Sequence, residues 1–363
     1  MIYLDNAAST PLIPEVIVDL CRNLDTFGNP SSIHLEGVKS KQLILGSKDK
    51  VSRKLHCNRD ELFFTTGATM SNNIILQGFN GEKCVSEIEH EDIQMLSDKF
   101  HYIKIPVDNK GRINIEELKV IANNLYESRC NVLFSIQMAN SEIGVIQDIE
   151  TISDIIHSYP GFYLHTDATQ YIPYFECDVQ TLKIDALSMS GQKIGCIKGT
   201  GLLYISEKLQ PLISPLIYGK QGLIGGTENV LGISCLGEAF NCLDYDNKQM
   251  ILLRNQLIAG LNGKLVGDID YRLPNNVCVM FRNVDAMSLV MLLNDYGICC
   301  SAGSACSSGD SEPSSTLLAI GLTSEQANSC VRFTLSKETT KFEIDYTIDT
   351  VNKAVEFLKG LKG

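Results

Sequence analysis

The alternation of short apolar runs with helix-forming stretches constrains the fold more than any other feature of this sequence. Each run is rich in Val, Leu, Ile or Phe, and a longer stretch of mixed polarity separates it from the next. This pattern is typical of parallel strands that are covered by helices on both faces. It predicts an α/β fold whose central sheet is mostly parallel and of the seven-stranded type. The strands that the apolar runs indicate are residues 62–65, 131–136, 162–165, 186–189 and 201–205.

The character of the chain changes after about residue 246. Helix-like and strand-like segments then alternate without the buried parallel pattern, and a loop of Gly, Ser and Cys interrupts them. The length of 363 residues allows two closely packed domains. We therefore expect a large domain of residues 14–247 and a smaller α+β domain of residues 1–13 and 248–363.

Charge and composition narrow the classes of partner. The net charge of −12 is spread along the chain without a Lys/Arg block, so no nucleic acid is expected. No basic leader or bilayer-length apolar run is present, so we expect a cytoplasmic protein with no membrane partner. The 13 cysteines lack paired metal-ligand spacing, which predicts no metal site and reduced core thiols such as Cys84, Cys130 and Cys278.

Two turns of small residues follow predicted strands and precede predicted helices. Residues 66–69 come directly after the run at 62–65, and residues 222–229 form the second turn. Backbone N–H groups at such a helix start can bind a phosphate, and the Thr69 hydroxyl would add a donor. A plain connection between a strand and a helix is the alternative for each turn.

Two ionisable side chains also stand where predicted strands end. Asp167 follows the run at 162–165, and a carboxylate there can pair with a pyridinium nitrogen. Lys193 follows the run at 186–189, and an amine there can form a Schiff base with an aldehyde cofactor. The alternatives are a helix-capping Asp and a surface Lys that extends its amine into water.

In this order the motifs resemble those of the cysteine desulfurases in the class V aminotransferase superfamily. The similarity runs nearly end to end, through residues 3–8, 27–34, 67–73, 140–144, 167–170, 301–306 and 331–335. It implies a pyridoxal 5′-phosphate (PLP) enzyme with the fold type I architecture of PLP-dependent transferases.

The resemblance also implies a role for individual residues. Lys193 would hold PLP, Asp167 would pair with its ring nitrogen, His90 would stack on the ring and Gln170 would bond its 3-oxygen. The phosphate would be held by Ala68, Thr69, Ser190 and Gln192, joined by Thr227 of the partner subunit in a homodimer with a shared active site.

Substrate binding is implied for Asn140 and Arg332, which would hold the α-carboxylate of L-cysteine; a planar guanidinium suits that task. Structural alternatives exist here as well. His90 could cap a helix, Arg332 could form a structural ion pair, and Asn140 could stabilise a turn.

Cys306 distinguishes desulfurases from related aminotransferases. It lies in a loop of Gly, Ser and Ala, from which a thiolate could take sulfur from cysteine as a persulfide, leave L-alanine and pass the sulfur to an acceptor protein or thiol. Iron–sulfur cluster assembly is one pathway this would serve. Cys299 and Cys300 are expected to be buried.

Other readings remain open from the sequence. One is a PLP enzyme of different specificity, such as a selenocysteine lyase, a C–S lyase or a transaminase. Another is a non-catalytic sulfur-trafficking scaffold. The chain also departs from the family pattern at Met70, Gln192, residues 196–197 and residues 224–225, which suggests a divergent member.

Overall fold

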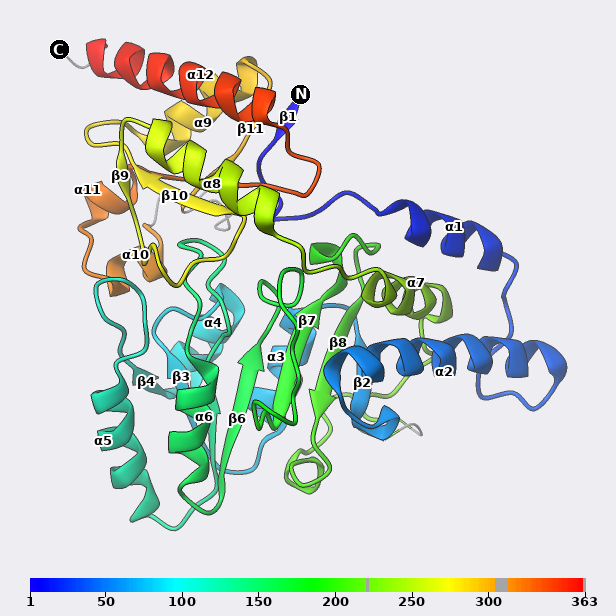
Figure 1. The fold of residues 1–363 in the computed structure, drawn as a ribbon. Coiled ribbons are helices and arrows are strands. Elements are labelled where there is room, and N and C mark those ends of the chain that lie inside the picture. The colour runs from blue at the N-terminus through cyan, green and yellow to red at the C-terminus, as the bar shows by residue number, and fades with distance from the viewer. Residues whose placement is uncertain (220–221, 304–312, 362–363) are drawn as a thin grey trace.

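The computed structural model describes residues 1–219, 222–303 and 313–361 (Figure 1). A seven-stranded sheet forms its centre, and six of the seven strands run in one direction. The mostly parallel sheet that the sequence predicts is therefore confirmed. In spatial order the strands are β2 (Leu62–Thr65), β8 (Gly201–Ile205), β7 (Ala186–Ser190), β6 (Phe162–Asp167), β5 (Val132–Ser135), β3 (Glu82–Ser86) and β4 (Ile103–Ile105).

The reversed strand is β8, which pairs antiparallel with both β7 and β2. Residues 191–200 connect β7 to β8, and they contain one short turn of helix, η2 (Gly191–Lys193). A parallel neighbour needs a crossover of about a dozen residues or more. The short connection therefore returns the chain in the opposite direction beside β7.

Alternate residues of the strands face two different apolar cores. In β5, Val132 and Phe134 belong to one core and Leu133 to the other, which is the two-residue period of a pleated strand. One core includes side chains of α1 (Pro14–Asn23), α2 (Leu35–Leu55), α5 (Ile115–Tyr126), α6 (Ile149–His157) and α7 (Val230–Asn241). The other includes side chains of α3 (Ala68–Gly78) and α4 (Glu91–Phe100). The sheet is thus covered on both faces, as expected.

The C-terminal part has its own antiparallel sheet, with strand order β12 (Ser301–Ala302), β13 (Cys330–Thr334), β10 (Asn276–Met280) and β9 (Lys264–Leu265). It lies at the upper end of the molecule in Figure 1, beyond the large sheet. Its helices are α8 (Lys248–Gly260), α9 (Ala286–Asp295), α10 (Ser315–Ala319), α11 (Ser324–Ala327) and α12 (Lys341–Gly360).

The N-terminal strand β1 (Ile2–Tyr3) joins this part of the molecule by pairing in parallel with β11 (Ile298–Cys299). The apolar core around β10 and α12 also contains Leu4. From these contacts we infer the division into a large domain of residues 14–247 and a small domain of residues 1–13 and 248–363.

Two expectations about side-chain burial need correction. Cys84, Cys278 and Cys300 are buried, but Cys130 and Cys299 are only partly buried. Cys130 lies in the turn between α5 and β5, where its thiol contacts the exposed Ser128 hydroxyl at 3.0 Å. A single apolar neighbourhood in the sequence does not distinguish such a turn from the strand that follows it.

None of the helices in the described part of the chain combines the length and the apolar character needed to cross a membrane.

Candidate active site

The carboxyl ends of β6 and β7 bring Asp167 and Lys193 into one region. Asp167 is the last residue of β6 and lies opposite Ser188 of β7, and Lys193 ends the turn η2 that follows β7. The charges of Asp167 and Lys193 both act on the imidazole of His90, which precedes α4. Three residues that are far apart in the sequence thus meet at one edge of the sheet, where α/β sheets bind ligands.

Asp167 is held firmly at this edge. One carboxylate oxygen accepts a hydrogen bond from the Thr169 N–H at 2.9 Å, and the other accepts one from the Asn72 side-chain amide at 3.0 Å. The residue is 7% exposed. Each carboxylate oxygen has a second lone pair for a further donor, so the group can still bind a protonated ring nitrogen.

The N-terminal segment lies against Lys193 and Gln170. The Lys193 ammonium donates to the carbonyl oxygen of Ala8, and the Gln170 amide donates to the carbonyl oxygen of Ala7 at 3.0 Å. Close by, the carbonyl oxygen of Gln192 accepts from the backbone N–H of Thr10 at 3.0 Å and from its hydroxyl at 2.9 Å. The segment that starts in the small domain therefore helps to shape the site.

The start of α3 lies beside Ser190, as the expected phosphate-binding turn requires, and its phosphate-binding role stays a prediction. The Ala68 N–H donates to the Ser190 hydroxyl oxygen at 2.8 Å, and the exposed Thr69 follows it in the first turn. The first N–H groups of any helix lack carbonyl partners within that helix. At Gly201 of β8 an added Cβ would lie 2.4 Å from the Cα of Gly67, so only glycine allows this close approach.

Thr227 of the same chain does not lie with Ala68, Thr69 and Ser190. It is exposed between β8 and α7, where it lines a hollow of about 330 Å³ together with Thr66 and Met70. Its contribution from a partner subunit stays a prediction.

His90 occupies the N-cap position of α4, which was one of its alternative roles. Its Nδ1 lies 2.7 Å from the Asp92 carboxylate Oδ1 and 3.5 Å from the Asp92 backbone N. One nitrogen cannot donate to the carboxylate and accept from the N–H at once. The 2.7 Å contact is much the stronger, so we assign a proton to Nδ1, and the hydrogen bond to Asp92 raises the pKa of His90.

Asn140 and Arg332 lie next to each other, and both already have structural partners. The Asn140 side chain accepts from the N–H groups of Glu142 and Ile143 at 2.8 Å each and donates to the Ile88 carbonyl at 3.0 Å. Arg332, on β13, donates to the Ser141 carbonyl at 3.1 Å. The Arg332 guanidinium, which belongs to the small domain, therefore lies at the turn that follows β5 in the large domain.

Arg332 also forms an ion pair with Asp5 at 3.0 Å, while its buried Nε has no partner among the described residues. Nearby, burial raises the pKa of Glu142, although the Ser314 hydroxyl and the charges of Arg332 and His90 act against the increase. Sequence reasoning missed Asp5, Glu142 and Asp92 as members of the site. The one local signal was for Asp92, a carboxylate two residues after a candidate histidine.

Cys306 lies outside the described residues. The chain enters its loop from β12, where Ser301 lies opposite Arg332 of β13. The last described strand before Cys306 therefore lies beside Arg332, the residue that is expected to bind the substrate carboxylate.

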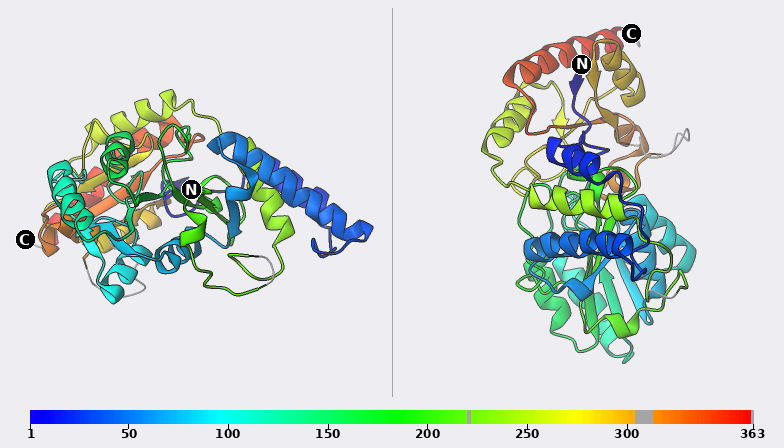
Figure 2. Two further views of the ribbon diagram at one scale, coloured as in Figure 1. Left: turned by 90° about the horizontal axis from the view of Figure 1, so that it is seen from below. Right: turned by 90° about the vertical axis from the view of Figure 1, so that its right-hand side faces the viewer.

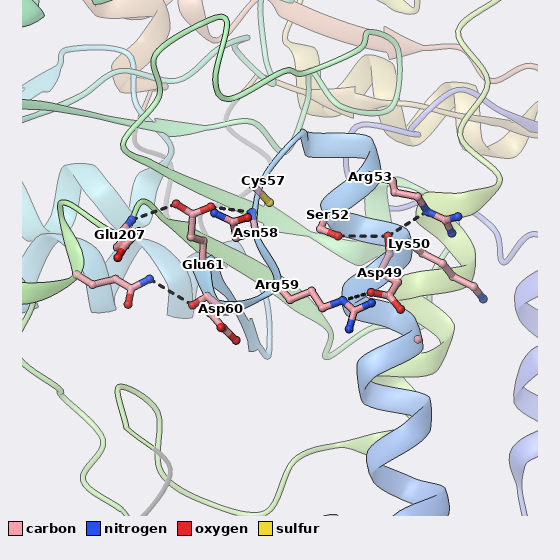
Figure 3. Close-up of a pocket in the computed structure, with 12 residues that line it drawn as sticks. Asp49, Lys50, Ser52, Arg53, Cys57, Asn58, Arg59, Asp60, Glu61 and Glu207 are labelled. Carbon is pink, nitrogen blue, oxygen red and sulfur yellow. Dashed lines mark hydrogen bonds and ion pairs between the residues drawn. The ribbon is translucent and has the colours of Figure 1, made fainter.

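A hollow of about 1110 Å³ elsewhere on the molecule contains none of the expected site residues (Figure 3). Some of its charged groups already have partners within its lining. Arg59 pairs with Asp49, and the Glu61 carboxylate accepts from the N–H groups of Asn58 and Glu207. Among the residues that the structure describes, no three His, Cys, Asp or Glu side chains form a metal site.

Known proteins resemble this chain over nearly its whole length. The family model described as Aminotransferase class-V matches residues 2–347. The cysteine desulfurase IscS of Dictyoglomus turgidum is 34% identical, covering 99% of this chain and 95% of the relative. The cysteine desulfurase IscS of Methanosarcina thermophila is 35% identical, covering 99% and 93%.

Solved structures give the same result. A NifS-like protein from Rickettsia africae is 29% identical, with a TM-score of 0.89 and coverage of 98% of this chain and 99% of the other. The structure of SspA in complex with cysteine is also 29% identical, with a TM-score of 0.80 and coverage of 92% and 99%. By sequence and fold, this chain belongs to the class V aminotransferase family, among its cysteine desulfurases.

Proposed function

We propose that this protein is a PLP-dependent cysteine desulfurase that converts L-cysteine to L-alanine and carries the released sulfur on Cys306. The observation that supports it most strongly is the meeting of Lys193, Asp167 and His90 at the carboxyl ends of β6 and β7. An amine, a carboxylate and an imidazole together provide the groups that bind an aldehyde-bearing pyridine ring.

The residues present fit PLP. Asp167 is buried and fixed, yet its oxygens retain lone pairs for the ring nitrogen. The first turn of α3 presents N–H groups beside the Ser190 hydroxyl, which suits a phosphate. Lys193 would hold the aldehyde carbon and Gln170 the 3-oxygen; the phosphate would be held by Ala68, Thr69, Ser190, Gln192 and the partner's Thr227.

When bound, PLP supplies an acceptor for the electrons that remain at the substrate Cα after its proton is removed. Lys193, displaced from the aldehyde carbon by the substrate amine, would remove that proton and later return it to Cα, while Arg332 with Asn140 would hold the α-carboxylate. The Cys306 thiolate attacks the substrate sulfur: the S–S bond forms and the C–S bond breaks. The electron pair of that C–S bond would stay on Cβ, which takes up a proton; with the proton that Lys193 returns to Cα, the product is L-alanine.

Arg332 has the chemistry for the carboxylate. Its guanidinium holds Asp5 and the Ser141 carbonyl, and its buried Nε is unpartnered within the described part of the chain. A carboxylate that accepted from Nε and a neighbouring nitrogen would satisfy this orphaned donor with forked geometry. An unpaired buried donor costs about 1–3 kcal/mol, so substrate binding would regain stability there.

We also propose a homodimer. Apolar side chains are exposed on α1, on the connection after it and at the start of α2, a region that projects to one side of the molecule (Figures 1 and 2). Exposed apolar patches of this kind mark protein interfaces. The residues are Ile17, Val18, Leu24, Phe27, Ile33 and Leu35. We propose that a second copy of this chain covers them, in a homodimer whose shared site would include the partner's Thr227.

Sulfur would pass from Cys306 to an acceptor protein or a small thiol. We place the reaction in the cytoplasm because the cysteines of the described residues are all free thiols, which suits a reducing compartment.

The test is turnover of L-cysteine by protein reconstituted with PLP, with alanine, pyruvate and sulfide measured together. We expect alanine and sulfide in equal amounts in the presence of a thiol reductant. Pyruvate as the main carbon product would instead indicate a C–S lyase. Binding of PLP without any turnover of cysteine would favour the scaffold alternative.

A further inference from the structure

A continuous chain of hydrogen bonds runs from His90 to Asp167 through Asp92 and Asn72, two residues that the proposed reaction does not use. His90 Nδ1 lies 2.7 Å from Oδ1 of Asp92. The side-chain amide of Asn72 then donates to Oδ2 of Asp92 at 3.1 Å and to Oδ2 of Asp167 at 3.0 Å. One amide nitrogen therefore uses both of its protons to join two carboxylates.

Asp92 and Asn72 are rigid enough to act as a frame. Asn72 is fully buried on α3, and the Asp92 side chain is 9% exposed in the first turn of α4. Oδ1 of Asp92 also accepts the Ile93 N–H at 3.0 Å. The His90 side chain, by contrast, is 47% exposed, so it is the end of the chain that can reach a bound molecule.

We propose that Asp92 is a positioning residue for the reaction described above. It fixes the His90 ring by accepting a hydrogen bond from Nδ1–H, so that Nε2 is the atom that gives or takes a proton at the site. Asn72 ties this His–Asp pair to Asp167, so the imidazole and the group that binds the ring nitrogen keep one relative orientation. The proposal rests on the proposed function.

The same arrangement governs the charge of His90. Asp92 is the nearest charge and the strongest influence, and its hydrogen bond favours the imidazolium. Asp167 on β6 acts in the same direction, and Lys193 in η2 acts against it. The buried Glu89 lies close enough to interact with Asp92 and Asp167, but burial raises its pKa well above the usual range, so it adds little negative charge. Glu142 interacts with His90 from the turn after β5, and burial raises its pKa too.

The experiment compares Asp92→Asn with Glu91→Gln. Asn keeps the size and the accepting oxygen of Asp92 but removes its charge. Glu91 lies in the same first turn and is exposed, so its replacement by Gln makes an equal change in net charge. The readout is the pKa of His90 from an NMR titration of the protein labelled at histidine; the chain has six histidines, and His90→Gln identifies the signal.

We expect Asp92→Asn to lower the pKa of His90 by about one unit or more, because a carboxylate in contact shifts a partner's pKa by about 1–3 units. Glu91→Gln should leave it near the wild-type value. In the holoenzyme, the limb of the pH profile of kcat/KM that His90 sets should move to lower pH by the same amount in Asp92→Asn. Asp92→Glu, which restores the charge, should recover part of the shift.

An equal His90 pKa in Asp92→Asn, Glu91→Gln and the wild type would overturn the inference, even in an active enzyme. A loss of activity in Asp92→Asn with an unshifted pH profile would also overturn it, because that pattern indicates a purely structural role. If the wild type fails to turn over cysteine, the proposed function fails instead. The NMR titration still decides whether Asp92 controls His90 in that case.

Discussion

Replacement of Arg332 by Lys tests the substrate side of the site because it keeps the charge and removes the forked geometry. The arginine donates through Nη1 to the Ser141 carbonyl and through Nη2 to Asp5, and its Nε is directed to neither. A lysine ammonium is a point charge that cannot bind a carboxylate with two parallel bonds. The variant therefore loses at least one charge-assisted hydrogen bond to the substrate.

Such a bond contributes about 1.5–3 kcal/mol. Since about 1.4 kcal/mol corresponds to a factor of ten, kcat/KM for L-cysteine should decrease by about 10- to 140-fold. The assay is the rate of alanine formation at several cysteine concentrations. The contact holds the α-carboxylate in the ground state and throughout the reaction. We therefore expect the decrease in kcat/KM to come mostly from an increase in KM.

Arg254→Lys is the matched control. Arg254 is also a buried arginine, 8% exposed on α8, and it donates to the carbonyl oxygens of Arg272 and Leu273, neither of which is an expected site residue. Both variants should lower the free energy of unfolding by about 1–3 kcal/mol, but only Arg332→Lys should change kcat/KM. An equal loss of kcat/KM in both variants would refute the reasoning, as would an unchanged KM in Arg332→Lys.

Three further changes test other parts of the account. Cys306→Ser should keep the absorbance of the bound cofactor and lose persulfide formation; sulfide release at the wild-type rate would contradict its role as nucleophile. Gly201→Ala should weaken PLP binding, measured by equilibrium dialysis, because the new methyl group would push the Gly67 backbone at the start of α3; wild-type affinity would contradict the close approach. Burial lowers the pKa of His165 to about 3, below its unfolded value of about 6.5. Between these two pKa values the unfolded state binds more protons than the folded state, so the free energy of unfolding should decrease as the pH falls from about 6.5 to about 3. Denaturant titrations should show that His165→Gln loses up to about 1.4 kcal/mol per pH unit of this dependence, and an unchanged slope would contradict the assignment.

The parts of the site that follow strands could be predicted from the sequence. Apolar runs indicate where strands end, and in a mostly parallel sheet those ends meet at one edge. Position alone therefore made Asp167 and Lys193 candidates, with a helix-capping and a surface role as alternatives, and offered a phosphate-binding turn or a plain connection before α3. The resemblance to cysteine desulfurases was needed to choose between these roles. The reversed direction of β8 depended on the length of one connection, which the apolar pattern does not encode.

Contacts between distant segments could not be predicted in the same way. Asp5 and Arg332 are 327 residues apart, and their ion pair depends on the pairing of β1 with β11 and of β12 with β13. Asn72 meets Asp167 only because α3 packs beside β6. Neither pairing has a local pattern, so only the folded structure relates these residues.

The most direct test of the central claim is to reduce the PLP-reconstituted protein with borohydride and to locate the labelled peptide by mass spectrometry. The account predicts a pyridoxyl group on Lys193, with an absorbance band before reduction that changes when L-cysteine is added and that is absent in Lys193→Ala. Labelling of a different lysine, or a band that persists in Lys193→Ala, would contradict the claim that Lys193 and Asp167 form the centre of this site.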